Sequence, residues 1–472
     1  MKMSFLLKAG LLAILVFTSL AQGAESQWPD PFMMEFPPIQ INPVEPQEIR
    51  LSNGLTVFLL EDRSLPLING VTYVRAGSNY DPEDQRGLAQ LTAMLAREGG
   101  AGKRTSADVD RTLEYLAASV ELSAAGPFVS ATFSSLAHNV EQVLPVVADI
   151  LQTPQFAADR LEILRGRLLE SIRRQVDQPV SLATREFFYR TASEHPSEAF
   201  ATLPSVQNLS RADVTAFHDR YYRPNHAVMA VSGDFDSEAM VQLLEETFGN
   251  WQPAPTELPT LPSMNMDPEP VIYHIQRDLA QSVVLLGHPV LTFDDPDYIR
   301  LDVLNRVLGG AGDNRLFTEI RTRRGYAYSV GSQVTQGFEY PGIFFAFSIS
   351  RADKTGEVIE LLLQEIEGVK NQAVSVEELE RNRSAIVNRA VFRYASVHAV
   401  AQRSALVHFL GVDPNYYDEH MAIIQDLTVE ELLAAGQRHL RPSDAVILVV
   451  GNDELFDQDL SDFGRVVEID LD

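Results

Sequence analysis

The chain has 472 residues, with 65 Asp and Glu against 38 Lys and Arg, so its formal net charge at pH 7 is −27. A hydrophobic share of 45% and a charged share of 22% are typical of globular proteins, which excludes a wholly disordered chain. The length is enough for about two to four domains of roughly 100–200 residues. The acidic balance argues against a nucleic-acid binder, which needs clustered Lys and Arg. The chain has no cysteine, which excludes disulfides and thiolate metal sites and suits an oxidising compartment.

The N-terminus predicts an export signal. Lys2 and Lys8 precede an apolar run over 9–17, and small residues follow up to Gly23. This pattern is typical of a secretory signal peptide over 1–23, which is removed from the mature protein. An uncleaved anchor is the alternative, but the run is shorter than the ~20 residues that span a membrane. No later segment is long and apolar enough to do so, and we therefore expect an exported protein, in the periplasm of a bacterium.

Apolar spacing predicts strands and helices in turn along the chain. A Pro-rich extended arm over 24–48 leads to a hairpin signal at Asn53-Gly54. The strands expected next are 69–76 and 127–136, and the helices are 84–98, 108–120 (after a Thr105/Ser106 cap), 137–152 and 157–175. A second Pro-rich stretch, 252–262, is the best linker. A strong strand is expected over 337–350, and its edge would suit an extended peptide.

Two segments of the chain resemble each other. Residues 209–233 align with 427–451 at a constant offset of 218 and without a gap. Each copy predicts a capped helix, an Arg-Pro turn and a buried strand that ends at Gly, so we infer a domain duplication. The order of elements predicts an α+β fold with two homologous domains, each a mostly antiparallel sheet with helices on one face. The expected boundaries are 49–251 for the first domain, 252–266 for the linker and 267–472 for the second domain.

Several motifs together resemble those of a known family. They are Gly-Leu-Ala-Gln-Leu-Thr-Ala-Met-Leu over 87–95, Phe-Gly-Asn-Trp over 248–251, and Arg-Gly-Tyr-Ala-Tyr-Ser over 324–329 after an Arg-Leu-Phe segment at 315–317. They are similar to motifs of the M16 (pitrilysin/insulinase-type) metallopeptidase family, and in particular of its short bacterial and mitochondrial-processing-peptidase branch. The resemblance covers roughly residues 46–455.

The resemblance also shows what this chain lacks. Active members carry H-x-x-E-H on the helix that begins here at Gly87, so that two His on one helix face hold zinc and the Glu activates water. The three positions fall on Gln90, Ala93 and Met94, none of which supplies that chemistry. The family's third ligand falls on or beside Glu170, whose alternative role on an Arg-rich helix is a surface ion-pair partner.

The ten histidines do not rebuild a metal site. No two of them share the i, i+4 spacing of a helical metal pair, and we expect His218 and His226 to be capping or surface residues and His420 to be structural. We expect no metal or cofactor in this chain. The Gly-rich stretch 309–312 lacks the Gly-Lys-Ser/Thr of a phosphate loop, so it predicts a turn and no nucleotide site.

The second half keeps Arg324 and Tyr328, which match an Arg and a Tyr that contact substrate near the zinc in the short branch. A guanidinium and a phenol both donate hydrogen bonds to a peptide carbonyl, so the resemblance implies substrate binding. The alternative is that Arg324 pairs with a nearby acid and Tyr328 is a strand residue that packs outward.

The hypothesis that follows is a division of labour. This chain would be the zinc-free, substrate-binding subunit of an exported heterodimeric peptidase, inactive alone, and a homologous H-x-x-E-H chain would supply the zinc. One alternative is a non-catalytic structural or peptide-binding module of the same fold. Another is a self-sufficient metallopeptidase with atypical ligands.

Overall fold

The structure, a computed structural model, describes residues 44–255 and 257–471. The expected signal peptide over 1–23 and most of the expected arm over 24–48 lie outside these residues. Strand β1 (Gln47–Arg50) includes the last two residues of the arm and pairs antiparallel with β2 (Thr56–Glu61). The Asn53-Gly54 signal lies in the turn between them, where Gly54 has φ of +90°, a left-handed conformation that glycine adopts without strain.

The first sheet has six strands in the order β1-β2-β6-β3-β5-β4. Its remaining strands are β3 (Leu67–Val74), β4 (Ser119–Ala125), β5 (Phe128–Leu136) and β6 (Ala227–Gly233). β2 and β6 pair in parallel, and the other neighbours pair antiparallel. The helices of this half are α2 (Leu88–Glu98), α3 (Ser106–Tyr115), α4 (Val140–Gln152), α5 (Ala158–Asp177), α6 (Pro179–Thr191), α7 (Leu203–Gln207), α8 (Arg211–Tyr221) and α9 (Ser237–Phe248).

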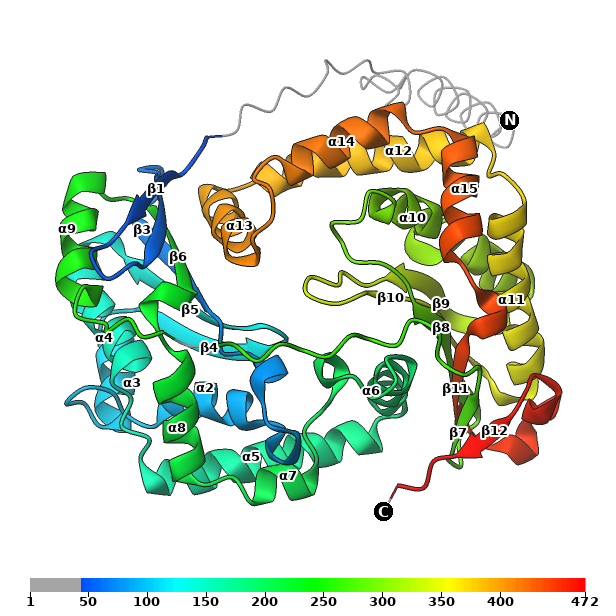
Figure 1. The fold of residues 1–472 in the computed structure, drawn as a ribbon, viewed down its shortest axis with the longest axis horizontal. Coiled ribbons are helices and arrows are strands. Elements are labelled where there is room, and N and C mark those ends of the chain that lie inside the picture. The colour runs from blue at the N-terminus through cyan, green and yellow to red at the C-terminus, as the bar shows by residue number, and fades with distance from the viewer. Residues whose placement is uncertain (1–43, 256, 472) are drawn as a thin grey trace, which may run out of the picture. The chain divides into compact units, whose positions relative to one another are not determined.

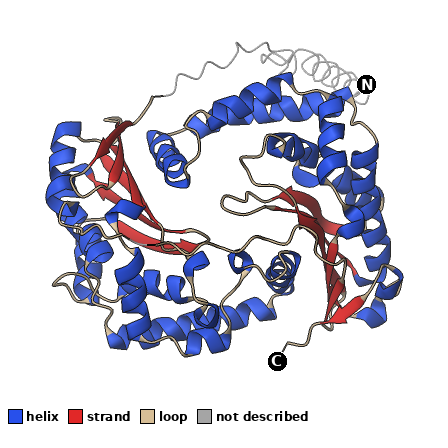
Figure 2. Ribbon diagram, in the orientation of Figure 1, coloured by secondary structure: helices blue, strands red, loops and turns tan. Residues whose placement is uncertain are grey.

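The second sheet repeats this topology in the order β12-β7-β11-β8-β10-β9. Its strands are β7 (Ile272–Gln276), β8 (Gln281–Pro289), β9 (Ala327–Val334), β10 (Ile343–Arg351), β11 (Val446–Gly451) and β12 (Val466–Glu468). Its helices are α10 (Tyr298–Asn305), α11 (Thr355–Asn371), α12 (Val376–Ala390), α13 (Val397–Leu410), α14 (Tyr416–Asp426) and α15 (Val429–His439), with two π-helical turns, η7 (Arg306–Gly310) and η8 (Phe317–Arg323). Figure 2 shows the two sheets, each with helices on its outer side. The predicted α+β class with two related sheets is confirmed.

The two sheets differ at one edge. In the first, β1 precedes its neighbour in the chain and pairs with it antiparallel, whereas in the second, β12 comes from the C-terminal end and pairs in parallel with β7. The remaining five positions match strand for strand, with the parallel pair β7–β11 equivalent to β2–β6.

Side-chain contacts repeat along with the backbone. Helices α8 and α15 begin at Arg211 and Val429, which are 218 residues apart, and each begins with a capping box, on Ser210 and on Thr428. The Arg165 guanidinium donates to the Leu209 carbonyl, and Arg383 makes the same contact with the carbonyl of Leu427, again at an offset of 218. The repeated segment therefore corresponds to repeated structure.

Each sheet is covered on its second face by a helix from the other half (Figure 1). Helix α13 packs on β2, β3 and β6, where Val400 and Phe409 join Phe58, Tyr73 and Val228 in one core. Helix α6 packs on β8 and β11, where Leu182 and Phe187 join a second such core. The sequence predicted helices on one face, and the structure adds this reciprocal exchange on the other.

Three predicted elements have different boundaries in the structure. The helix expected over 84–98 begins only at Leu88, because Gly87 adopts a left-handed conformation with φ of +98°. The helix expected over 108–120 ends at Tyr115, since Ser119 begins β4. The strand expected over 337–350 begins at Ile343 and lies between β8 and β9, so its backbone is already paired on both sides. The prediction that this strand accepts a peptide by edge pairing is therefore wrong, because the edge strands are β1 and β4 in the first sheet and β12 and β9 in the second.

In the region between the sheets, residues 252–255 and 257–266 form no helix or strand. Among the described residues, no helix is long and apolar enough to cross a membrane.

The prediction that His218 is a capping or surface residue is wrong. Its side chain is buried, its Nε2 donates to the Leu151 carbonyl oxygen at 3.0 Å, and its ring stacks on Tyr222 with centroids 4.4 Å apart. Burial lowers the pKa of His218 to about 4. His420 packs against the Tyr416 ring at 3.7 Å, and burial lowers its pKa also to about 4, as fits a structural residue.

The buried His218 makes stability depend on pH. Its pKa is about 4 in the folded state and about 6.5 when unfolded, so its stabilising contribution is complete above pH 6.5 and is lost as the pH falls towards 4. We expect the free energy of unfolding of His218→Gln to fall less steeply over this interval, by up to about 1.4 kcal/mol per pH unit. Urea unfolding at several pH values measures the slope. The exposed His138→Gln is the control, and equal slopes in the two variants would contradict the assignment.

Candidate functional site

Helix α2 carries the positions of the zinc motif, and its N-terminus is fixed by Asp81. The two carboxylate oxygens of Asp81 accept hydrogen bonds from the backbone N–H groups of Gly87 and Ala89, each at 2.8 Å. These bonds satisfy donors that would otherwise have no partner at a helix start. Asp81 is buried, and this burial raises the pKa of its carboxyl group to about 7. The helix is thus held in place by the protein's own groups.

The three motif positions lie on α2 at the i, i+3 and i+4 spacing of one helix face. The Gln90 side chain is exposed, Ala93 is fully buried in the first core, and Met94 is half-buried against that core. At the positions that the resemblance assigns to two imidazoles and a carboxylate, this chain therefore has a neutral amide, a methyl group and a thioether. None of the three is a hard anionic or imidazole donor of the kind that Zn²⁺ prefers.

Glu170 lies on α5, which packs against α2. Its side chain is 50% exposed, and its carboxylate pairs with Arg174 at 3.1 Å and with Arg173 at 3.9 Å. Both partners lie within one helical turn, which is the arrangement of a surface ion-pair residue. Among the described residues, no three His, Asp or Glu side chains come together in a way that could hold a metal ion. The residues present at the family's zinc position do not fit that ion.

Arg324 and Tyr328 flank the start of β9, the edge strand of the second sheet. The Tyr328 side chain is 76% exposed, and the Arg321 guanidinium lies 4.8 Å from the centre of its ring. Arg324 immediately follows η8 and pairs with Glu319, a residue of that same turn. Both side chains thus reach solvent at a sheet edge, and both of the interactions expected as alternatives, an acid partner and an outward-facing Tyr, are present.

The surroundings of this pair are cationic. Glu319 accepts from Arg323 at 2.8 Å as well as from Arg324, so one carboxylate serves two guanidinium groups. Arg321 adds a third positive charge, held against the rings of Phe317 and Tyr328. Because Arg323 keeps Glu319 paired, Arg324 can exchange its partner for a substrate group without leaving an isolated carboxylate. The arrangement is suited to carbonyl or carboxylate oxygens of a bound chain.

The turn that precedes Arg324 is anchored by a second arginine. Arg315 donates two hydrogen bonds to Glu378 of α12, at 2.8 and 2.9 Å, in the bidentate geometry that guanidinium and carboxylate groups favour. Glu378 also accepts from the backbone N–H of Ser375, the N-cap of α12. The Arg315 hydrogen bond is the main reason that the pKa of Glu378 falls to about 2. Because Arg315 and Glu378 are 63 residues apart, no local pattern in the sequence predicts this pair.

We expect Arg315→Ala to lower the free energy of unfolding by about 1–3 kcal/mol, because it leaves Glu378 without its main partner. The folded pKa of Glu378 is depressed, so the stability it provides is present above pH 4.5 and is lost as the pH falls towards 2. The variant should therefore lose less stability in acid than the parent. Chemical unfolding at pH 7 and in acid tests this. The control is Arg351→Ala, which removes the arginine of an exposed ion pair with Asp353. An unchanged stability at pH 7 would show that the pair does not anchor the turn.

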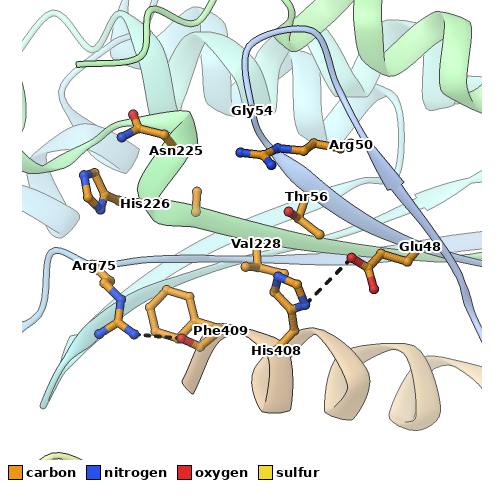
Figure 3. A pocket seen from close by; sticks show the side chains of 11 residues that line it. Glu48, Arg50, Gly54, Thr56, Arg75, Asn225, His226, Val228, His408 and Phe409 are labelled. Atoms are coloured by element: carbon orange, nitrogen blue, oxygen red, sulfur yellow. Dashed lines mark hydrogen bonds and ion pairs between the residues drawn. The ribbon is translucent and has the colours of Figure 1, made fainter. Parts of the chain in front are cut away.

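A separate cavity of about 320 Å³ lies where the first sheet meets α13 (Figure 3). Arg75 lies at one end, and its guanidinium donates to the Glu339 carboxylate at 2.6 Å and to the Phe409 carbonyl at 2.8 Å. At the other end, His408 of α13 lies 3.9 Å from Glu48 of β1. Its walls thus come from both halves, and they include none of the residues predicted for the site, so we interpret it as part of the joint between the halves.

Comparisons with known proteins agree with this architecture. Residues 68–201 match the model of insulinase (peptidase family M16), and residues 208–386 match the model of the peptidase M16 inactive domain. Among curated relatives, an uncharacterized zinc protease of Rickettsia bellii is 24% identical over 86% of this chain and 97% of its own length. A second such protein, from Mycobacterium tuberculosis, is 25% identical over 84% of this chain and 90% of its own length.

Among solved structures, a peptidase M16 inactive domain from Pseudomonas fluorescens has a TM-score of 0.79 and 25% identity, covering 87% of this chain and 98% of its own. A protease from Helicobacter pylori has the same TM-score at 18% identity, over 87% of this chain and all of its own. Both matched models belong to one family, and together they span most of residues 68–386. The chain belongs to the M16 peptidase family.

Proposed function

We propose that this chain is the zinc-free, substrate-binding subunit of an exported, heterodimeric M16-type metallopeptidase that degrades or processes peptides. A homologous chain with an intact H-x-x-E-H motif supplies the zinc. The observation that carries the proposal is an asymmetry between two sites of the same chain. The zinc positions hold an amide, a methyl group and a thioether, while Arg324 and Tyr328 are both present and reach solvent.

The roles of the two residues follow from their surroundings. The Tyr328 phenol is free to donate a hydrogen bond to a peptide carbonyl oxygen, because its side chain is 76% exposed at the sheet edge. Arg324 can donate to a second oxygen of the same substrate peptide, while Arg323 stays paired with Glu319 and neutralises its charge. Such donors position the substrate and stabilise charge that develops on a carbonyl oxygen. The proposed site of action is the periplasm, after removal of the signal over 1–23.

The first test concerns metal and activity. We expect the purified chain to bind no stoichiometric zinc, measured by metal analysis after dialysis, and to cleave no peptide. Mixing it with the zinc-bearing homologue should restore cleavage. One tightly bound zinc per isolated chain would favour a self-sufficient enzyme instead. Full cleavage by the homologue alone would favour a structural or peptide-binding module.

The second test concerns the two donors. In the reconstituted enzyme, Arg324→Ala or Tyr328→Phe should lower kcat/KM about tenfold to a hundredfold, because each removes one hydrogen-bond donor to the substrate. Both residues are exposed, so the melting temperature should not change. Tyr115→Phe, at a tyrosine that is 87% exposed on α3, is the matched control and should leave activity unchanged. Undiminished activity in both site variants would exclude the proposed contacts.

A further inference from the structure

A second cationic feature lies apart from Arg324, in a groove between the turn η7 and the end of α12. Its volume is about 300 Å³, and we call it the arginine groove. Its lining consists of three arginines and three apolar side chains: Arg306, Ile386, Arg389, Ala390, Phe392 and Arg393.

The charge in this groove is largely uncompensated. Most arginines in the described part of the chain pair with a carboxylate of the same chain, as Arg104 does with Asp149. Arg389 and Arg393 have no ion pair with a described residue, and Arg306 makes only a loose one, at 3.6 Å, with Asp302. The buried Nε of Arg306 has no hydrogen-bond partner. In a chain with a net charge of −27, the groove thus gathers three guanidinium groups with one loose carboxylate partner.

The groove also presents an apolar contact surface. The Phe392 side chain is 71% exposed in the turn that follows α12, while Ile386 and Ala390 beside it are buried. Arg393 is held against the ring of Tyr417, 5.1 Å from its centre, and its carbonyl accepts a hydrogen bond from Arg403. An exposed aromatic ring beside oriented guanidinium groups is the composition of a surface that binds another chain.

One wall of the groove belongs to a turn that packs against the strand of the proposed substrate site. Arg306 begins the π-helical turn η7, and η7 packs against β9, the strand that carries Tyr328. The contact is close, since a side chain at Gly309 would meet the backbone of Ser332, and Asn305 accepts a 2.6 Å hydrogen bond from the Ser332 hydroxyl. Single π-helical turns are maintained at a cost in backbone geometry and are frequent at functional sites.

We propose that the arginine groove binds an acidic segment of the peptide substrate, in which carboxylates flank an apolar side chain. The carboxylates pair with Arg389 and Arg393, and the apolar side chain packs on Phe392. The place of the groove on the substrate path rests on the proposed function, whereas the binding itself does not depend on proteolysis. The groove would select against basic peptides, which the rest of this acidic chain attracts.

The test measures binding to the isolated full-length chain by fluorescence anisotropy. The probe is a labelled peptide in which glutamates flank a phenylalanine, and its twin has every glutamate replaced by glutamine. We expect the acidic probe to bind more tightly than its twin. Binding should weaken as salt rises from about 0.05 to 0.5 M, because screening shortens the range of exposed charges. The variant R389E/R393E should weaken it about tenfold or more.

Two controls separate this effect from a general change of charge. The variant R63E/R465E makes the same change at exposed arginines in other parts of the chain and should leave binding unchanged. Phe392→Ala should weaken binding of both probes while the far-ultraviolet circular dichroism is preserved. Equal binding of the two probes, or equal losses in R389E/R393E and R63E/R465E, would overturn the proposal. The proposal would also be overturned if R389E/R393E bound the acidic probe normally but no longer bound the zinc-bearing homologue. That result would assign the groove to the contact between subunits.

The failure of this proposal is distinguishable from failure of the proposed function. If the isolated chain binds zinc, or if the partner cleaves peptides alone, the anisotropy result still shows whether the groove binds an acidic peptide. If the groove is correct and the enzyme reconstitutes, R389E/R393E should raise KM for acidic substrates with kcat nearly unchanged, since the groove lies away from Tyr328 and contributes binding alone.

Discussion

The structure depends on an exchange of helices between its halves. The face of the first sheet that carries Phe58 and Tyr73 is covered by α13, and the face of the second that carries Leu285 and Phe345 is covered by α6. Apolar surface left in water costs about 25 cal/mol per Å², so neither sheet buries its second face without a helix from the other half. The contacts of Arg75 with Glu339 and Phe409 act across the same boundary. The position of each sheet edge, β9 included, therefore follows from packing that spans both halves.

Much of this architecture could be predicted from the sequence, because it depends on local patterns. The capping residues Ser210 and Thr428, the Arg-Pro turns and the buried strands repeat at one spacing, and they indicated the duplication. The exchange of α6 and α13 carries no such signal, since an amphipathic pattern shows that a helix face is buried but not against which sheet. Strand β4 was missed although Val120 and Leu122 alternate with polar residues, because the helix expected over 108–120 already included its first two residues.

For the site, the motif positions could be placed from sequence, but their environments could not. The pairing of Glu319 with Arg323 follows from their i, i+4 spacing, but nothing in the chain near Arg315 reveals that it is paired with Glu378. His218 was expected to be a capping or surface residue because it lies beside the Arg-Pro turn, and only the fold shows that it is buried against Tyr222. Helix α2, on which the resemblance places the zinc motif, is well formed without zinc ligands at those positions, because Asp81 caps it and Leu91 and Leu95 are fully buried.

The exchanged helices are themselves counterparts in the duplication. Helix α6 begins at residue 179 and α13 at residue 397, an offset of 218 that equals the offset of the repeated segment. Before the two copies were joined, a single copy would have left the same sheet face uncovered and the same helix without a partner. Its stable form would have been a symmetric homodimer in which each protomer lent this helix to the other. Joining the two copies in one chain makes this mutual cover independent of protein concentration, since the two halves can no longer separate.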